Sequence, residues 1–251
     1  MKTVKITRTA AVAAALAFAS IATAAPGPAP SAAQVQAALA NPGRSAEDKA
    51  ADARRKAAEL VAFAELQPGE KVADIYPGGG YFTRVFAAAV GPQGKVYGVF
   101  SRPSDQATAL TRNPAFQNVA LVTGPWAEMK TPEPLDLIFI SQFYHDLYNP
   151  EYGGPGGAPG FNKAAFAALK PGGVYLVIDH AAPAGTGTSA HNTTHRIDEE
   201  AVKRDVTAAG FVYEGSSPVL RNAADARTAN VFDPAIRGKT DQFVLKFRKP
   251  A

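Results

Sequence analysis

From residue 69 onward the sequence alternates short apolar runs with helical segments, and this alternation constrains the fold more than any other feature. Several runs are nearly continuous valine, isoleucine, leucine, tyrosine and phenylalanine, which is typical of strands covered on both faces. The pattern predicts an α/β fold with a Rossmann-like, doubly wound, mostly parallel sheet and right-handed crossovers. The predicted strands are residues 71–76, 95–100, 118–124, 135–141, 173–179, 211–217 and 241–248.

Two connections in this pattern lack a convincing helix. Residues 217–240 join the last two predicted strands as a loop, so the terminal strand can pair antiparallel with a neighbour. We therefore expect a seven-stranded sheet with an antiparallel terminal strand. Residues 149–161 are rich in glycine and proline and are predicted to form an irregular loop, a candidate lid or substrate wall.

The first 24 residues have the pattern of a secretory signal peptide. Lys2, Lys5 and Arg8 precede an alanine-rich apolar run, and residues 22–24 (ATA) form a small-x-small cleavage site. A membrane anchor is the alternative, but the apolar run is shorter than the roughly 20 residues that a span requires. The mature protein is therefore predicted to be periplasmic or secreted, with no stable membrane insertion after cleavage.

Composition narrows the domain plan and the functional classes. Residues 25–44 are rich in proline and alanine and look like a flexible tether, whereas residues 45–251 read as one domain whose first helix is capped by Ser45. The absence of cysteine excludes disulfides, thiolate metal sites and thiol nucleophiles. Signal cleavage would leave 23 basic against 22 acidic residues, so nucleic acid is not implied as a partner.

The segment DIYPGGGYFTRVF, residues 74–86, follows the first predicted strand at the edge where open parallel sheets bind ligands. Without side chains at Gly78, Gly79 and Gly80, the backbone can approach a ligand closely, and the N–H groups at the helix start favour anionic oxygen. Asp74 can accept a hydrogen bond from an ammonium group or from the turn. Three glycines can also simply make a tight bend, so the turn alone leaves both interpretations open.

The pattern Asp-x-Tyr-Pro-Gly-Gly-Gly at residues 74–80 resembles motif I of the class I S-adenosylmethionine-dependent methyltransferases. The segment ALKPGGVYLVIDH, residues 168–180, resembles their fifth strand and the turn before it. YPGGGYFT, FYHDLY, HRID and the ending TDQFVLKFRKP further resemble a bacterial group of exported "predicted methyltransferases". The resemblance covers roughly residues 50–249 and implies S-adenosyl-L-methionine as cofactor and methyl transfer to an unidentified small-molecule substrate.

The resemblance also implies which residues contact the cofactor. Tyr76 replaces the first glycine of the motif and must point away, close over the methionine end or block the site. The second predicted strand ends near Ser101 without the carboxylate that holds the ribose in the family. Trp126 can stack on adenine or can be buried in the core. The implied cofactor-binding set is Asp74, Tyr76, Gly78, Gly79, Gly80, Ser101 and Trp126.

The residues after the fourth predicted strand lie where that family places the acceptor. There His145 can act as a base oriented by Asp146, and Tyr144 can shape the acceptor pocket. The alternative is a structural histidine that caps a helix or bonds a backbone carbonyl. Asp179 and His180, at the end of the fifth predicted strand, are expected to point into the same crevice.

Farther along, Asp198 is predicted to cap a helix, which leaves His195 and Arg196 free to contact an anionic substrate. No metal site is expected, because no HxH or HExxH spacing appears among the four histidines. A nicotinamide-dependent oxidoreductase is disfavoured by the missing G-x-G-x-x-G spacing. The main alternative to an enzyme is an exported binding protein that keeps the fold without catalysis.

Overall fold

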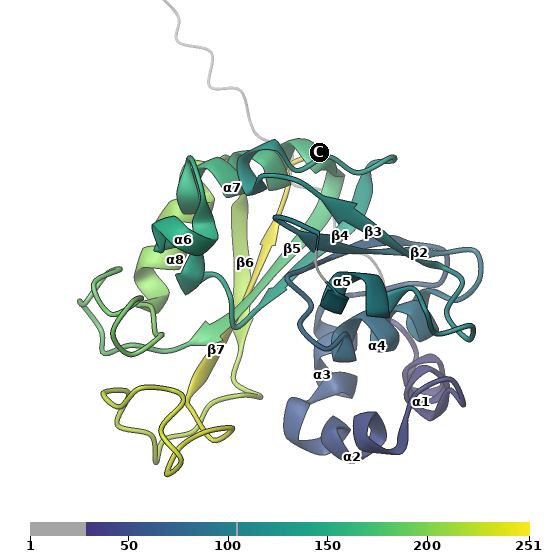
Figure 1. Cartoon of the computed structure of the whole chain (residues 1–251), viewed down its shortest axis with the longest axis horizontal. Helices are drawn as coiled ribbons and strands as arrows, with labels where there is room; N and C mark the ends of the chain where they lie inside the picture. Colours follow the sequence, from purple (N-terminus) through teal and green to yellow (C-terminus); the bar gives the residue numbers. More distant parts are fainter. Residues whose placement is uncertain (1–28, 104) are drawn as a thin grey trace, which may run out of the picture.

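The structure, a computed structural model, describes residues 29–103 and 105–251. The predicted signal peptide and residues 25–28 of the predicted tether lie outside the described residues. Figure 1 shows one twisted sheet with helices on both sides. Within the described ranges, no helix has the length and apolar character needed to cross a membrane.

Seven strands form a single sheet in the order β3-β2-β1-β4-β5-β7-β6. Strands β1 to β5 pair in parallel, and β7 runs antiparallel between β5 and β6. This arrangement confirms the predicted seven-stranded, mostly parallel sheet with an antiparallel terminal strand. The strands are β1 Lys71–Ile75, β2 Lys95–Phe100, β3 Val119–Thr123, β4 Leu135–Ser141, β5 Leu169–His180, β6 Val212–Ser217 and β7 Gln242–Arg248.

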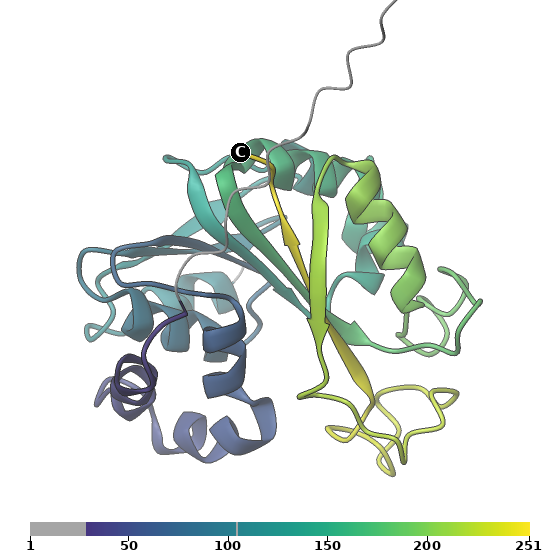
Figure 2. The same cartoon turned by 180° about the vertical axis from the view of Figure 1, so that it is seen from behind.

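Helices cover both faces of the sheet because the strands bury side chains on both faces. On β5, Leu176 and Ile178 belong to the core under one helical layer, whereas Tyr175 and Val177 belong to the core under the other. Figures 1 and 2 show α1 to α4 gathered on one side and α7 and α8 on the opposite side. The first layer holds α1 Ala32–Ala40, α2 Ala46–Arg55, α3 Ala57–Phe63, α4 Tyr81–Val90 and α5 Asp105–Leu110; the second holds η1 Trp126–Glu128, η2 His145–Tyr148, α6 Pro150–Gly153, α7 Gly157–Ala168 and α8 Glu199–Ala208.

The structure differs from the predicted tether in residues 31–44. Ser31 and Gln34 form a capping box that starts α1. Val35 and Ala38 are buried, and Val35 belongs to the same core as α3 and α4. The Arg44 guanidinium is buried and pairs with a carboxylate of α2. Residues 31–44 are therefore part of the folded domain. The sequence did not reveal this because an alanine-rich helix with only two buried positions has a weak apolar pattern. The predicted cap at Ser45 is confirmed.

The predicted irregular loop at 149–161 is also partly wrong, since it contains α6 and the first turn of α7. The Asn149 side chain caps α6, and Pro150 occupies the first helical position, where its missing N–H costs nothing. Gly156 has a φ of +86° at the start of α7. The glycine and proline residues of this segment therefore mark helix starts.

The carboxyl ends of the parallel strands meet at one edge of the sheet. His180 at the end of β5 pairs with Gln242 at the start of β7. Because β7 runs antiparallel, this pairing brings the loop 218–241 to the edge where the glycine turn and residues 142–149 also lie (Figure 1). The candidate site is therefore built from loops that are distant from one another in the sequence.

Candidate functional site

The glycine turn leaves β1 and lines a hollow of about 420 Å³, here called the glycine-turn hollow. Gly78 and Gly80 have φ values of +57° and +77°, in the left-handed region that favours glycine. A Cβ at Gly79 would meet no atom within 4 Å, so the turn presents bare backbone there. A Cβ at Gly80 would lie 2.1 Å from Leu110 Cδ2, so that glycine is required by internal packing.

Asp74 lies at the inner wall of this hollow and is buried. Its Oδ2 accepts a hydrogen bond of 2.6 Å from Thr83 Oγ1 on α4. Burial raises the pKa of Asp74 to about 7, even though the Thr83 hydroxyl favours the ionised form. The carboxyl group therefore links β1 to α4 beneath the turn as well as lining the hollow.

Tyr76 separates the glycine-turn hollow from a second one of about 120 Å³, the small hollow. Its side chain lines both hollows, and Ser101 at the end of β2 lines the small one. The phenol ring stacks on Phe143 with ring centroids 4.3 Å apart, and it is 39% exposed. The structure thus makes Tyr76 a partition between the two hollows.

Trp126 is core, which corrects its assignment as a cofactor-binding residue. The side chain is 2% exposed, and its ring lies edge-on to Phe161 and tilted against Phe143. The indole Nε1 donates a hydrogen bond of 2.7 Å to the backbone oxygen of Tyr152. Trp126 therefore supports Phe143, the residue on which Tyr76 stacks, and presents no ring face to a ligand.

Tyr144 is also buried, so it cannot shape an acceptor pocket as the sequence suggested. Its hydroxyl accepts a hydrogen bond of 2.8 Å from Asn162 Nδ2 on α7. Burial raises the pKa of Tyr144 well above its ordinary value. This hydrogen bond anchors the loop after β4 to α7. The Tyr144 ring packs in the same core as the apolar side chains of β4.

His145 follows on the same loop and is 2% exposed. Its Nδ1 lies 2.9 Å and 3.0 Å from the two carboxylate oxygens of Asp179. Its backbone N–H donates a further hydrogen bond of 2.8 Å to Asp179 Oδ2. Since a carboxylate accepts, Nδ1 carries the proton and Nε2 presents a lone pair. Asp179 therefore orients His145, a role that the sequence had assigned to Asp146.

On the other side of the ring, Nε2 of His145 faces Asp146 and His195. It lies 3.4 Å from Asp146 Oδ1 and 3.3 Å from His195 Nδ1. Burial disfavours the charged imidazole, but the carboxylates of Asp179 and Asp146 raise the pKa of His145. For Asp146, burial disfavours the charged carboxylate and so raises the pKa. The sequence placed His145 and Asp146 together but did not predict His195 beside them, because fifty positions separate the two histidines.

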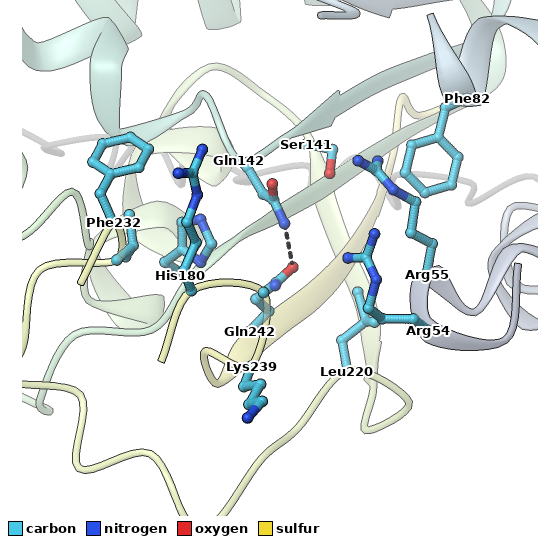
Figure 3. Close-up of a pocket in the computed structure, with 13 residues that line it drawn as sticks. Arg54, Arg55, Phe82, Ser141, Gln142, His180, Leu220, Phe232, Lys239 and Gln242 are labelled. Atoms are coloured by element: carbon cyan, nitrogen blue, oxygen red, sulfur yellow. Dashed lines mark hydrogen bonds between the residues drawn. The ribbon is translucent and has the colours of Figure 1, made fainter. Parts of the chain in front are cut away.

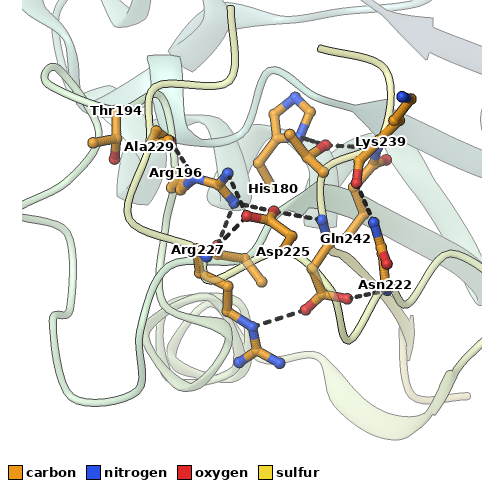
Figure 4. Close-up of polar contacts among 12 residues, drawn as sticks. His180, Thr194, Arg196, Asn222, Asp225, Arg227, Ala229, Lys239 and Gln242 are labelled. Atoms are coloured by element: carbon orange, nitrogen blue, oxygen red, sulfur yellow. Dashed lines mark hydrogen bonds and ion pairs between the residues drawn. The ribbon is translucent and has the colours of Figure 1, made fainter. Parts of the chain in front are cut away.

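Arg196 is not free to contact a substrate, which corrects a further expectation. Its guanidinium is fully buried and makes two hydrogen bonds, of 2.9 Å and 3.1 Å, with the Asp225 carboxylate. A third bond, from Nε, reaches the backbone oxygen of Ala229 (Figure 4). Arg196 therefore fastens the loop 218–241 to the segment before α8. The predicted cap at Asp198 is confirmed.

A hollow of about 600 Å³, here called the cationic hollow, lies between α2, the ends of β4 and β5, and the loop 218–241 (Figure 3). Four cationic side chains contribute to its wall, and none of its lining residues in the described part of the chain is acidic. These cations are Arg54, Arg55, Arg237 and Lys239. The sequence did not reveal this cluster, because nothing in the arginine pair at the end of α2 indicates that a loop about 180 residues later lies opposite.

The cationic hollow adjoins the glycine-turn hollow. The two hollows share five of their lining residues, namely Arg54, Arg55, Phe82, Ser141 and Gln142. In the described part of the chain, none of the four cations forms an ion pair with a carboxylate. Burial lowers the pKa of Arg55, whose guanidinium lies 4.6 Å from the Tyr81 ring centroid. Unpaired positive charge in a concave wall favours an anionic ligand.

A family model described as protein-L-isoaspartate(D-aspartate) O-methyltransferase matches residues 31–146. A protein-L-isoaspartate O-methyltransferase of Ignicoccus hospitalis is 32% identical over 87 residues, which cover 34% of this chain and 41% of that protein. The chain thus spans about two fifths of the length of this curated relative. The matched segment includes the glycine turn and ends at Asp146.

The solved structures that match cover more of the chain than the family model does. An S-adenosylmethionine-dependent methyltransferase from Aquifex aeolicus has a TM-score of 0.57 at 17% identity, over 87% of this chain and 98% of that one. The chain has a class I methyltransferase fold. The glycopeptide N-methyltransferase MtfA, complexed with sinefungin, shares this methyltransferase fold with a TM-score of 0.56 at 14% identity, over 80% and 87% of the two chains.

The methyltransferase fold does not by itself define the reaction. The [4+2]-cyclase SpnF matches with a TM-score of 0.60 at 18% identity, over 90% of this chain and all of that one. Function must therefore be argued from the hollows and their side chains. The resemblance noted in the sequence is confirmed at the level of the methyltransferase fold, and the exported bacterial subgroup stays a prediction.

Proposed function

We propose that this protein is an S-adenosylmethionine-dependent methyltransferase whose acceptor is a small carboxylate. One observation carries the proposal: the bare backbone at Gly79 faces a hollow that shares a wall with the unpaired cations of the cationic hollow. When bound, S-adenosylmethionine supplies an electrophilic methyl group on a sulfonium centre. The family match over residues 31–146 and the solved methyltransferases support the choice of cofactor.

The residues fit the amino-acid end of this cofactor. The glycine-turn hollow, at about 420 Å³, is in the range of roughly 300–1,000 Å³ that small-molecule sites occupy. The backbone of Gly78 and Gly79 and the guanidinium of Arg55 would hold the methionine portion. At the nucleoside end, Ser101 supplies a hydroxyl, but the small hollow is too small for an adenosyl group. Tyr76 must therefore leave Phe143 when the whole cofactor binds.

The side chains around the cationic hollow suit an anionic acceptor. Arg237 and Lys239 lie on the loop side, and Arg54 and Arg55 lie on the α2 side, so a carboxylate can be held between them. Ser141 and Gln142 border both hollows and mark where donor and acceptor would meet. The relative from Ignicoccus is named for L-isoaspartate, which also carries a carboxylate.

A carboxylate acceptor also agrees with the position of His145. Carboxylates are ionised near neutral pH, so the nucleophilic oxygen needs no general base. The ring of His145 faces Asp146 and His195. His145 is not among the residues that line the cationic hollow or the glycine-turn hollow. The chain's contribution to transfer is then to hold the acceptor, align it and exclude water. His145 is not required as a base in this proposal.

Substituting Gly79→Ala tests the proposed cofactor site. The new methyl group meets no protein atom within 4 Å, so we expect the melting temperature to change little. When the cofactor occupies the hollow beside the turn, the new methyl group should collide with it. Such overpacking costs about 1–3 kcal/mol and weakens cofactor binding about 5- to 100-fold. Titration calorimetry with S-adenosylmethionine and S-adenosylhomocysteine measures this loss. Absence of saturable heat with both compounds for the unmodified protein would remove the proposal.

The stacked Tyr76 ring specifically favours a second candidate, a binding protein that keeps the methyltransferase fold without using the donor. The Tyr76→Gly substitution distinguishes the enzyme from the binding protein, because it removes the ring that separates the two hollows. Glycine also suits the local φ of +48°. If the cofactor binds by displacing the ring, losing one stacked pair of about 0.5–1.5 kcal/mol should tighten binding about 2- to 10-fold. Tyr213→Ala, a similarly exposed tyrosine on β6, serves as the control. Binding that appears only in the Tyr76 variant would support the second candidate.

A further inference from the structure

Three ligand-type atoms converge where the loops after β4 and β5 meet. His145 Nε2 and Asp146 Oδ1 are 3.4 Å apart, His145 Nε2 and His195 Nδ1 are 3.3 Å apart, and His195 Nδ1 and Asp146 Oδ1 are 3.6 Å apart. Among the described residues, these side chains form a group compact enough to share one metal ion. The three atoms thus define a nearly equilateral triangle.

The size of this triangle fits a tetrahedral ion. With metal–ligand bonds of about 2.0–2.1 Å, two ligands of a tetrahedral zinc ion lie about 3.3–3.4 Å apart. Adjacent ligands of an octahedral ion with similar bonds lie only about 3.0 Å apart. A hydrogen-bonded triad would be expected at about 2.7–3.2 Å. The three separations lie close to the tetrahedral value, and only the 3.3 Å contact between His145 Nε2 and His195 Nδ1 also qualifies as a long hydrogen bond.

Asp146 supplies an independent observation that points to a ligand. Its Oδ1 is buried and accepts no hydrogen bond in the described structure. A buried carboxylate oxygen without a partner is costly, so such an atom calls for an explanation. The two nearest nitrogens approach it with poor hydrogen-bond geometry, whereas a cation at the centre of the triangle would satisfy all three atoms.

The surroundings of the triangle are those of a metal site. The Asp179 carboxylate holds Nδ1–H of His145 and so directs the Nε2 lone pair to the centre, as a carboxylate behind a metal-bound histidine does. His195 has a φ of +54°, a backbone conformation that needs support from its surroundings. Its ring contacts Phe232 with centroids 4.9 Å apart. The side chain of His195 remains 24% exposed, which leaves one side of the triangle open.

We propose that His145 Nε2, Asp146 Oδ1 and His195 Nδ1 bind one divalent metal ion, with zinc the best match, and leave a fourth position open toward solvent. Two imidazoles and one carboxylate without thiolate form a ligand set that zinc accepts. A three-ligand site with an open position is the arrangement that binds water or a substrate atom. The Phe232 contact places this site next to the cationic hollow, whose wall includes the same phenylalanine.

Metal titration of the full chain, free of any histidine tag and stripped with a chelator, tests this proposal. We expect one Zn²⁺ per chain by calorimetry and by elemental analysis of the dialysed protein. Co²⁺ should give the intense visible absorption of a tetrahedral site. At free Zn²⁺ about 100 times the dissociation constant, the melting temperature should rise by about 5–10 °C. The measurement needs no S-adenosylmethionine, so it fails or succeeds independently of the proposed methyl transfer.

Substitutions then assign the ligands. His195→Ala removes a partly exposed ligand with little risk to folding, and Asp146→Asn keeps the side-chain shape. Each should weaken Zn²⁺ binding at least 100-fold and abolish the cobalt spectrum. His191→Ala is the matched control, because His191 belongs to the same loop and lies outside the triangle. Absence of stoichiometric binding, or binding that survives His195→Ala, would show that the cluster is only a polar network and would overturn the proposal.

Discussion

Replacing Arg196 with methionine should destabilise the folded protein by about 3–5 kcal/mol. Both partners of the Arg196–Asp225 pair are buried, so the substitution leaves the Asp225 carboxylate uncompensated in the interior. That carboxylate also accepts a hydrogen bond of 2.7 Å from the Asp241 backbone N–H. The loop 218–241 would therefore lose its attachment to the segment before α8. Urea unfolding measures the free-energy change.

Lys203→Met provides the control for this prediction. Lys203 pairs with Glu199 and Glu200 on the exposed side of α8, where such pairs contribute at most about 1 kcal/mol. The melting temperature of the Arg196 variant should fall by about 10 °C or more, and that of the Lys203 variant by only a few degrees. Equal losses in the two variants would contradict the role assigned to the buried pair.

The second large effect is the pH dependence that Asp74 imposes on stability. Burial raises the pKa of Asp74 from 3.8 to about 7, so between these values the folded state keeps a proton that the unfolded chain has released. The resulting stabilisation is fully present below about pH 4 and is lost as pH rises through 7. Three pKa units correspond to about 4 kcal/mol.

Asp74→Asn should therefore flatten the fall in unfolding free energy between pH 4 and pH 8. The amide oxygen can still accept the hydrogen bond from Thr83, so the variant should match the unmodified protein near pH 4 and exceed its stability at pH 8. Urea unfolding at several pH values gives both slopes. Asp233→Asn, at an exposed aspartate, serves as the control and should leave the slope unchanged. Parallel curves for the Asp74 variant and the unmodified protein would refute the assignment.

The two expected effects concern different parts of the site. Arg196 holds one wall of the cationic hollow, and Asp74 lies under the turn of the glycine-turn hollow. A loss of Arg196 should therefore weaken binding of the proposed carboxylate acceptor through the loop 218–241, whereas the charge on Asp74 acts on the turn. Asp74 lies outside the proposed zinc triangle. Arg196, in contrast, is the chain neighbour of His195 and fastens the loop whose Phe232 contacts the His195 ring, so the loss of Arg196 should also weaken metal binding.

The sequence by itself determined the architecture. Apolar runs without polar alternation indicated strands buried on both faces, and the missing helix before the last strand indicated its antiparallel direction. The glycine triplet and the caps at Ser45 and Asp198 were also readable, because each depends on residues within a few positions of one another. These local signals are sufficient for a doubly wound sheet with a ligand edge. They carry no information on which loops meet at that edge.

Only the tertiary structure decided the chemistry of the site. The pairing of Ser141 with Ile178 in the sheet places the loop after β4 beside the end of β5, which makes Asp179 the partner of His145. The same neighbourhood brings in His195, whereas Tyr144 and Trp126 turn into the core. The pairing of His180 with Gln242 likewise brings Lys239 opposite Arg54. Such contacts depend on strand order and register, which no local pattern encodes.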